Sequence, residues 1–337
     1  MVFVLVYVDD IIVTGPSPSA CQQIITRLSS LFPIKDLGPL HYFLGIEVKR
    51  SSQGIYISQT KYILDLLKKA HMDGAKPCAT PLSTSKLDHS SPLLDNAVTY
   101  RSLVGALQYL TWTRPDLSFA VNLVCQYMHS PRHSHFQAVK RIFRYLKGSI
   151  DLGLWFPKCS SSPSITAFSD ADWAGCPLDR KSTGGFCIFL GSSLISWSAK
   201  KQPTVARSST EAEYRSLANT AAELTWICKL LVDLAYQSPS IPHLWCDNVS
   251  ALSLAKNPLC HARTKHVELD YHYIREKVLA REVSVHYICT QQQVADICTK
   301  ALAKDRFHSL RNKLSLRSPP LSLRGDIKDT YVNETVS

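Results

Sequence analysis

Paired cysteines are absent from this sequence. Its eleven cysteines form no Cys-x-x-Cys pair and follow no regular spacing. Structural zinc sites and disulfide frameworks depend on such spacing, so neither is expected to hold this fold together. We expect the cysteines to be buried thiols of a reducing compartment.

Long apolar runs are also absent. No run approaches the roughly 18 residues that a helix needs to cross a bilayer. The apolar start, residues 1–13, is interrupted by Asp9-Asp10 and carries no basic leader, which argues against a signal peptide. These absences predict a soluble intracellular protein, cytoplasmic or nuclear and not secreted, with no membrane partner.

Acidic residues are scarce relative to basic ones. The chain has 38 Lys and Arg against 27 Asp and Glu, a net charge of +11 and a pI near 9.1. This excess indicates a polyanionic partner such as nucleic acid. The length of 337 residues predicts about two domains, and an apolar fraction of 45% is sufficient for packed cores.

A segment rich in serine and proline, residues 158–164, is the best candidate for a linker between two domains. It separates a first domain at residues 1–157 from a second at residues 165–305. Residues 306–337 lose hydrophobic periodicity, so we expect them to form a flexible tail.

Both domains mix strand and helix patterns. In the first domain, short β patterns occur at residues 2–8, 11–14, 43–48 and 54–58, and helical patterns follow as far as residue 146. The second domain follows the order βββ-α-β-α-α-β-α, with a long amphipathic helix at about 210–235 and a last helix from Val294. The fold class is therefore predicted to be α/β (α+β).

Four carboxylates of the second domain stand where regular elements would present them. Asp170 and Asp247 close short apolar runs, Glu213 lies in the first turns of the long helix, and Asp296 opens the last helix. Anions brought together in a fold repel one another unless a cation collects them. Oxygen ligands of this kind suit Mg²⁺, so the pattern predicts metal-assisted phosphodiester hydrolysis.

Spacing alone leaves two of these assignments open. Asp172 follows Asp170 by two residues and could share its face of a strand. Glu211 and Glu213 both flank the apolar stripe of the long helix, and either could cap the helix start. The capping role is the better interpretation for Glu211.

Residues 165–305 resemble the ribonuclease H domain of copia-type LTR retrotransposons. The resemblance rests on a set of short stretches in the same order, namely Ser169-Asp-Ala-Asp-Trp-Ala-Gly175, Lys181-Ser-Thr-Gly-Gly185, Ser208-Ser-Thr-Glu-Ala-Glu-Tyr214, Cys246-Asp-Asn248, Lys265-His266 and Ala295-Asp-Ile-Cys-Thr-Lys300. It implies a ribonuclease H-like mixed sheet flanked by helices and hydrolysis of the RNA strand of RNA–DNA hybrids. It selects Asp170 over Asp172 and Glu213 over Glu211.

The resemblance also implies a catalytic site and its ions. Asp170, Glu213, Asp247 and Asp296 would hold two Mg²⁺ ions, with Mn²⁺ as a substitute, in two-metal catalysis. Recognition of a hybrid requires contacts to phosphates. Candidates for these contacts are the basic residues Lys181, Lys200, Lys201, Lys256, Arg263 and Lys265. A histidine before the last aspartate is common in this family, but Cys289-Thr-Gln-Gln-Gln293 occupies that stretch, which leaves His266 and His286 as weaker alternatives.

The beginning of the chain resembles a reverse transcriptase of the same elements. Tyr7-Val8-Asp9-Asp10 looks like the palm motif, in which paired aspartates bind metals. We interpret residues 1–157 as a truncated palm and connection region in which Asp9 and Asp10 are a polymerase remnant. Because an upstream metal-binding strand and the fingers are not seen, no DNA synthesis is expected from this chain alone.

Two functional hypotheses follow from these patterns. The first is an active ribonuclease H that acts in a virus-like particle or the nucleus, with other Pol polyprotein segments as partners. The second is a non-catalytic nucleic-acid-binding relic that keeps only a basic surface. Retention of all four carboxylates favours the first hypothesis. The oligomeric state has no signature in the sequence.

Overall fold

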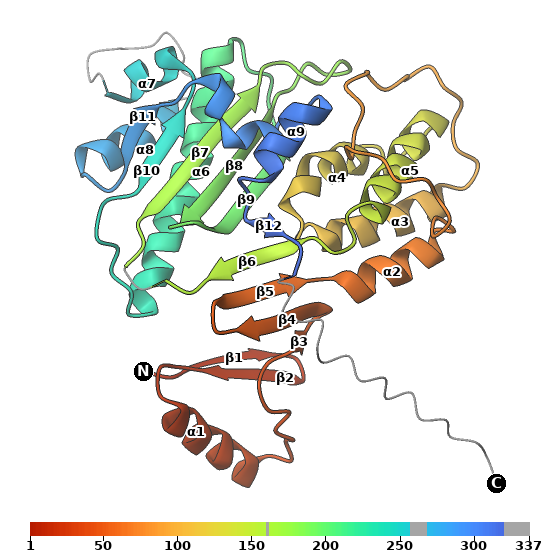
Figure 1. The fold of residues 1–337 in the computed structure, drawn as a ribbon. Coiled ribbons are helices and arrows are strands. Elements are labelled where there is room, and N and C mark those ends of the chain that lie inside the picture. Colours follow the sequence, from red (N-terminus) through yellow and green to blue (C-terminus); the bar gives the residue numbers. More distant parts are fainter. Residues whose placement is uncertain (160–161, 257–267, 320–337) are drawn as a thin grey trace, which may run out of the picture.

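The computed structural model describes residues 1–159, 162–256 and 268–319, and the strands of these ranges form three sheets (Figure 1). None of the helices in these ranges is long and apolar enough to span a membrane. Helices pack against both faces of the third sheet.

The first sheet is the predicted N-terminal hairpin. Strands β1 (Phe3–Tyr7) and β2 (Asp10–Thr14) pair antiparallel. Helix α1 (Pro18–Leu31) follows, capped by the Ser17 hydroxyl, which accepts from the Ala20 amide. Helix α1 buries none of its residues, and the hairpin lies with it at one end of the molecule (Figure 1).

The second sheet is antiparallel and joins segments that are far apart in sequence. Its order is β12-β6-β5-β4-β3, formed by Leu316–Arg317, Gly153–Pro157, Gly54–Ser58, Ile46–Ser51 and Tyr42–Phe43. The strand predicted at residues 43–48 is wrong in one respect. The chain turns between β3 and β4, where Leu44 and Gly45 both have positive φ angles.

A helical layer packs beside this sheet. It contains α2 (Thr60–Lys69), α3 (Ala97–Leu110), the 3₁₀ turn η1 (Pro115–Leu117), α4 (Ser118–Cys125) and α5 (His133–Lys147). Apolar residues recur on one face of each helix, so α3 buries Leu103, Leu107 and Leu110. The fully buried Arg114 forms a bidentate contact with Asp116 of η1, with N–O distances of 2.9 and 2.8 Å.

The third sheet carries the predicted carboxylates. Its order is β11-β10-β7-β8-β9, formed by Ser284–Tyr287, His243–Cys246, Ile165–Asp172, Thr183–Leu190 and Ser193–Lys201. Strands β7, β10 and β11 are parallel, while β8 is antiparallel to both β7 and β9. This arrangement confirms the mixed sheet that the sequence resemblance implied.

Helices cover both faces of this sheet. Helices α6 (Ser209–Asp233), α7 (Val249–Lys256) and α8 (Glu268–Leu279) pack on one face, and α3–α5, η4 (Val294–Cys298) and α9 (Lys304–Arg311) pack on the other. Successive side chains of β8 point to opposite faces of the sheet. Ile188 points into the core beneath α6, whereas Cys187 and Phe189 point into the core shared with the helical layer.

The end of the chain differs from the prediction. The last predicted helix is a 3₁₀ segment, η4, and the expected flexible tail begins with ordered structure. Helix α9 buries Phe307 and Leu310, and β12 pairs with β6 of the second sheet. The boundary predicted at residue 305 is therefore wrong. Residues 320–337, like residues 160–161 of the linker, lie outside the described residues.

Candidate active site

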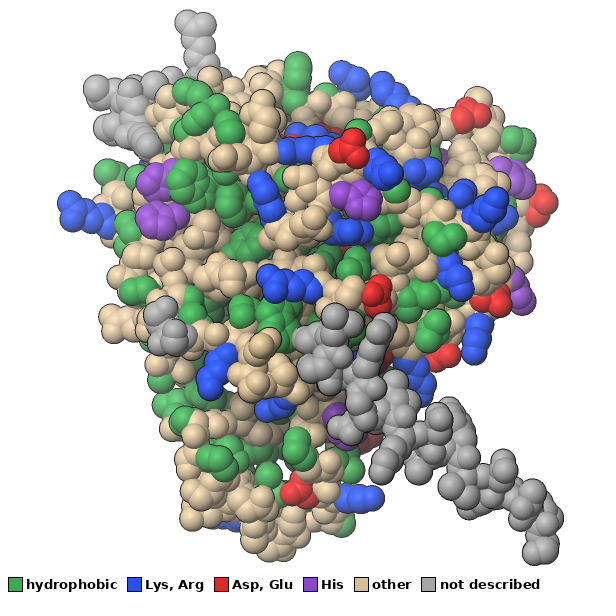
Figure 2. All heavy atoms as spheres, viewed as in Figure 1, with side chains coloured by type: hydrophobic (Ala, Val, Ile, Leu, Met, Phe, Trp, Pro, Cys, Tyr) green, Lys and Arg blue, Asp and Glu red, His purple; other side chains and the backbone are tan. Residues whose placement is uncertain are grey.

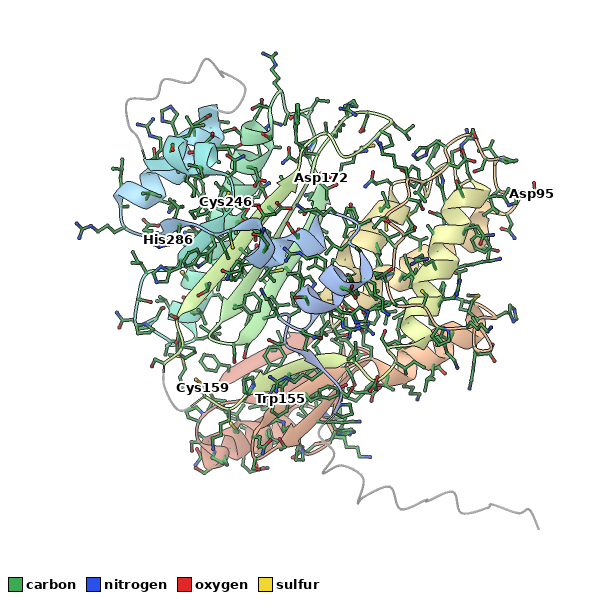
Figure 3. All side chains as sticks on the ribbon, turned by 45° about the horizontal axis from the view of Figure 1, so that its top comes forward. Asp95, Trp155, Cys159, Asp172, Cys246 and His286 are labelled. Atoms are coloured by element: carbon green, nitrogen blue, oxygen red, sulfur yellow. The ribbon has the colours of Figure 1, made fainter. Side chains whose placement is uncertain are left out.

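Two of the four carboxylates are placed by neighbouring parallel strands. Asp170 lies near the end of β7, and Asp247 directly follows β10. Because β7 and β10 run in the same direction, with His243 beside Thr166, both strands end at the same edge of the sheet. Figure 3 shows Asp172 and Cys246 near this edge, with Cys159 and Trp155 at the other end of the molecule.

Helix α6 brings Glu213 to the same edge. The helix starts at the Ser208 hydroxyl, which accepts from the Glu211 amide at 3.1 Å. Glu211 accepts from the Arg207 amide and forms an ion pair with Arg215 at 2.7 Å, so it serves the helix start, as expected. Glu213, two residues further along the helix, is 7% exposed and faces the carboxylates of the sheet.

The 3₁₀ segment η4 supplies the fourth carboxylate. Asp296 is buried and lies between two cations, with Lys300 Nζ 2.8 Å from its Oδ1 and the Arg306 guanidinium 3.0 Å from its Oδ2. Lys300 Nζ also lies 3.3 Å from Asp170 Oδ2. One ammonium therefore joins the carboxylate of β7 to that of η4.

The remaining two carboxylates also meet. One ligand atom each of Glu213, Cys246 and Asp247 lies within 4.8 Å of the others. The charge of Glu213 interacts in turn with Asp170 and Asp247, which connects the two pairs into one cluster. The structure thus brings all four predicted carboxylates together. Thr290 and Thr299 donate hydrogen bonds to Asp247 and Asp170, respectively, and hold their orientation.

The cluster carries more negative charge than its neighbours balance. Burial, followed by repulsion from Asp170 and Asp247, raises the pKa of Glu213 to about 9. Burial also raises the pKa of Asp170, despite the opposing effect of Lys300. Oδ1 of Asp247 is buried without a hydrogen-bond partner among the described residues. Oxygen donors, excess negative charge and an orphaned carboxylate oxygen fit a hard divalent cation such as Mg²⁺.

Asp172, the alternative to Asp170, has a different environment. Its carboxylate accepts a hydrogen bond from the Thr183 amide and lies against Gly175, where a Cβ would collide with it. Burial raises the pKa of Asp172 to about 7. Asp172 therefore organises the loop between β7 and β8, and Asp170 is the aspartate of β7 that contacts Lys300.

The predicted phosphate contacts that the structure describes, Lys181, Lys200 and Lys201, lie at or beside the paired ends of β8 and β9. Lys201 is ion-paired with Asp179 at 2.9 Å, so a phosphate would compete with that carboxylate. Lys200 is exposed at the end of β9, and Lys181 is half-buried in the loop before β8. Arg263, Lys265 and the side chain of Lys256 lie outside the described residues. Figure 2 shows basic side chains scattered over the visible face, with acidic ones between them.

Of the two histidine alternatives, one lies among the described residues. His266 lies outside the described residues. His286 contacts His243 of β10, with 3.1 Å between Nε2 and Nδ1, and Ser284 Oγ at 2.6 Å. In the same region, Arg306 binds Asp296 and the backbone carbonyls of Thr290 and Gln293.

Comparison with known proteins identifies the family. Residues 1–84 match the model of the reverse transcriptase (RNA-dependent DNA polymerase) family. The chain is 48% identical over 330 residues to the retrovirus-related Pol polyprotein from transposon RE2 of Arabidopsis thaliana, a match covering 97% of this chain and 23% of that polyprotein. It is 54% identical over 226 residues to an uncharacterized mitochondrial protein of the same plant, covering 66% of this chain and 93% of that protein.

The chain belongs to the copia-type Pol polyproteins of retrotransposons. It spans about a quarter of the length of the transposon polyproteins that it matches. Among solved structures, the foamy viral protease-reverse transcriptase in complex with double-stranded DNA matches 85% of this chain and 46% of its own, at 12% identity and a TM-score of 0.48.

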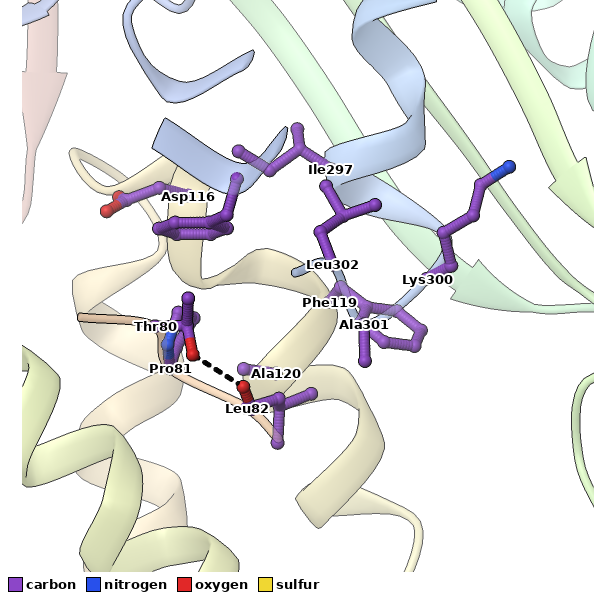
Figure 4. A pocket seen from close by; sticks show the side chains of 11 residues that line it. Thr80, Pro81, Leu82, Asp116, Phe119, Ala120, Ile297, Lys300, Ala301 and Leu302 are labelled. Carbon is purple, nitrogen blue, oxygen red and sulfur yellow. Dashed lines mark hydrogen bonds between the residues drawn. The ribbon is translucent and has the colours of Figure 1, made fainter. Parts of the chain in front are cut away.

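The polymerase motif of this copia-type chain is remote from the cluster. Asp9 and Asp10 are exposed at the turn of the N-terminal hairpin, while the four carboxylates lie at an edge of the third sheet (Figure 1). A cavity behind η4 is lined mainly by apolar side chains such as Phe119 and Leu302, and it borders the cluster at Lys300. Figure 4 shows the Lys300 side chain at its rim, directed away from Asp116.

Neither of the two cations of the cluster in this copia-type chain was predicted to belong to the site. Lys300 was part of a quoted motif but received no role, and Arg306 was assigned to the flexible tail. A signal for Lys300 was present, because four residues separate it from Asp296 and that spacing favours an ion pair on a helical segment. Arg306 had no such signal, since its contacts depend on how α9 returns to η4.

Proposed function

We propose that this chain hydrolyses the RNA strand of RNA–DNA hybrids by two-metal catalysis at the carboxylate cluster. The observation that carries this proposal is the convergence of Asp170, Glu213, Asp247 and Asp296 from four separate elements. Buried carboxylates are costly to gather unless the site gains something from their shared charge. Membership of a retrotransposon Pol family supports a nucleic acid as the substrate.

Each element of the cluster has a defined task in this proposal. Asp170, Glu213, Asp247 and Asp296 would offer the oxygens that hold the metal ions. Thr290 and Thr299 fix two of these carboxylates, and the guanidinium of Arg306 fixes a third. Bound Mg²⁺ ions, or Mn²⁺ in their place, would supply the activated water and stabilise the leaving oxygen.

The net charge supports a polyanionic substrate. An excess of eleven positive charges attracts a nucleic-acid backbone and makes its binding sensitive to salt. The half-buried Lys181 and the exposed Lys200 are the described residues that we propose as phosphate contacts. Preference for a hybrid over double-stranded RNA would require contacts to a 2′-hydroxyl on one strand only.

Cleavage of a labelled RNA–DNA hybrid tests the proposal directly. In the presence of MgCl₂ or MnCl₂, the unmodified chain should cut the RNA strand, and Asp247→Asn should lose more than about 100-fold in rate. Mutation of a residue that only contacts a metal ligand already costs about 10–100-fold in metal affinity or activity, so loss of a ligand should cost more. Asp95→Asn is the matched control, because Asp95 is exposed on the opposite side of the molecule (Figure 3). Hybrid binding without any metal-dependent cutting would support the non-catalytic relic instead.

A further inference from the structure

Lys300 has an unusual place in the carboxylate cluster. Its ammonium lies between two buried carboxylates that come from different elements, 3.3 Å from Asp170 Oδ2 and 2.8 Å from Asp296 Oδ1. These are oxygens that the proposed function assigns to a divalent cation. A lysine ammonium and a metal ion cannot both occupy the space between the same two oxygens.

The two cations of the cluster differ in how firmly they are held. Arg306 binds Asp296 and also donates to the backbone carbonyls of the loop at residues 290–293, so it is part of that loop's structure. The ammonium of Lys300 forms ion pairs only with Asp170 and Asp296 among the described residues. Leaving the cluster would therefore cost this ammonium only these two ion pairs.

Lys300 also has a route out of the cluster. Its side chain is 38% exposed, while those of Asp170 and Asp296 are 2% and 5% exposed. A lysine has a long flexible stem with a compact charge at its end, so it can move to solvent without disturbing the backbone. The carboxylates stay in place because Thr299 and Arg306 hold them.

We propose that Lys300 is a tethered counter-cation, which fills the space between Asp170 and Asp296 when no metal is bound and is displaced by the incoming divalent ion. This inference rests on the proposed function, since it takes the cluster to be a metal site. The effect of Lys300 on metal affinity is therefore opposite to that of a metal ligand. Lys300 stabilises the empty site and thereby weakens the affinity for metal.

The size of this effect follows from the contacts that are exchanged. Charge-assisted hydrogen bonds are stronger than neutral ones, but this ammonium is partly solvated and can recover hydration when it leaves. We expect removal of the Lys300 charge to tighten divalent-ion binding by about tenfold, which corresponds to about 1.4 kcal/mol. Retention of the charge in Lys300→Arg should keep the affinity within about threefold of the unmodified chain.

Calorimetric titration of the full chain with MnCl₂ measures this directly, without nucleic acid or turnover. Lys300→Gln should bind Mn²⁺ about tenfold more tightly than the unmodified chain. Lys304→Gln is the matched control, because it removes the same charge from an exposed position at the start of α9. This control should leave the affinity nearly unchanged, which would separate a local effect from one of net charge.

The possible results discriminate between the two proposals. Equal Mn²⁺ affinity in the unmodified chain and Lys300→Gln would overturn the counter-cation role and leave the metal site intact. Weaker binding by Lys300→Gln would also overturn it, since Lys300 would then support the bound state. If Lys304→Gln tightens Mn²⁺ binding as much as Lys300→Gln does, the effect comes from net charge alone and the counter-cation role is overturned. Absence of Mn²⁺ binding in every variant would refute both the proposed function and this inference.

Discussion

Replacement of Glu213 by Gln should stabilise the metal-free chain at neutral pH. The Glu213 side chain is buried beside Asp170 and Asp247, and these surroundings raise its pKa from 4.5 to about 9. The folded chain therefore holds a proton on this carboxyl at pH values where the unfolded chain has lost it. Between pH 4.5 and 9 the free energy of unfolding must fall as the pH rises.

The magnitude follows from the separation of the two pKa values. At pH 7 the unfolded carboxyl is far above its ordinary pKa, and each pK unit corresponds to 1.36 kcal/mol. Keeping Glu213 in the folded cluster therefore costs about 3 kcal/mol at this pH. Gln has the same shape and no charge in either state, so Glu213→Gln should raise the free energy of unfolding by about 3 kcal/mol. A gain of this size raises the melting temperature by about 5 °C.

Urea unfolding in EDTA at pH 4 and pH 7 measures the effect. The two proteins should have equal stability at pH 4, where both folded and unfolded Glu213 carry a proton, and should differ at pH 7. Glu223→Gln, about three turns further along α6, is the matched control. Addition of MgCl₂ at pH 7 should stabilise the unmodified chain more than Glu213→Gln. A gain that is the same at both pH values would refute the reasoning, as would no gain at all.

Two further predictions concern the packing that supports the site. Arg114→Met leaves the fully buried Asp116 without its partner, so urea unfolding should show a free energy of unfolding lower by about 3–5 kcal/mol. Arg101→Met, on the exposed side of α3, is the control and should change it by less than about 0.5 kcal/mol. Gly153→Ala should cost about 1–3 kcal/mol, because its Cβ would lie 2.3 Å from the Ile57 carbonyl. Gly74→Ala meets no atom within 4 Å and is its control, and equal melting temperatures for the two glycine variants would contradict this account.

Much of the local structure could be predicted because it is written in short-range patterns. Short apolar runs predicted the strands that end near Asp170 and Asp247, and the three-four spacing predicted α6. Position within those elements nominated the four carboxylates, but it left Asp172 and Glu211 as alternatives that only the family resemblance excluded. Glu211 was correctly expected to cap α6, because capping depends only on neighbours in the sequence.

The errors fall where contacts are made over long distances in sequence. Strand β12 has two residues, too few for any periodicity, and it exists because β6 offers a free edge. The core of the helical layer continues into Cys187 and Phe189 of β8, so the segment at residues 158–164 does not divide the apolar cores. Neither the strand pairing nor the shared core produces a pattern in the neighbouring sequence.

The sequence by itself determined which residues can do chemistry: it placed each carboxylate at the end of a strand or the start of a helix, where short-range forces decide its position. Only the tertiary structure decided what balances their charge. The packing of η4 against β7 and the return of α9 to η4 bring Lys300 and Arg306 against Asp170 and Asp296. Electrostatic partnership depends on distance in space, and distance in space is set by the packing of the whole chain.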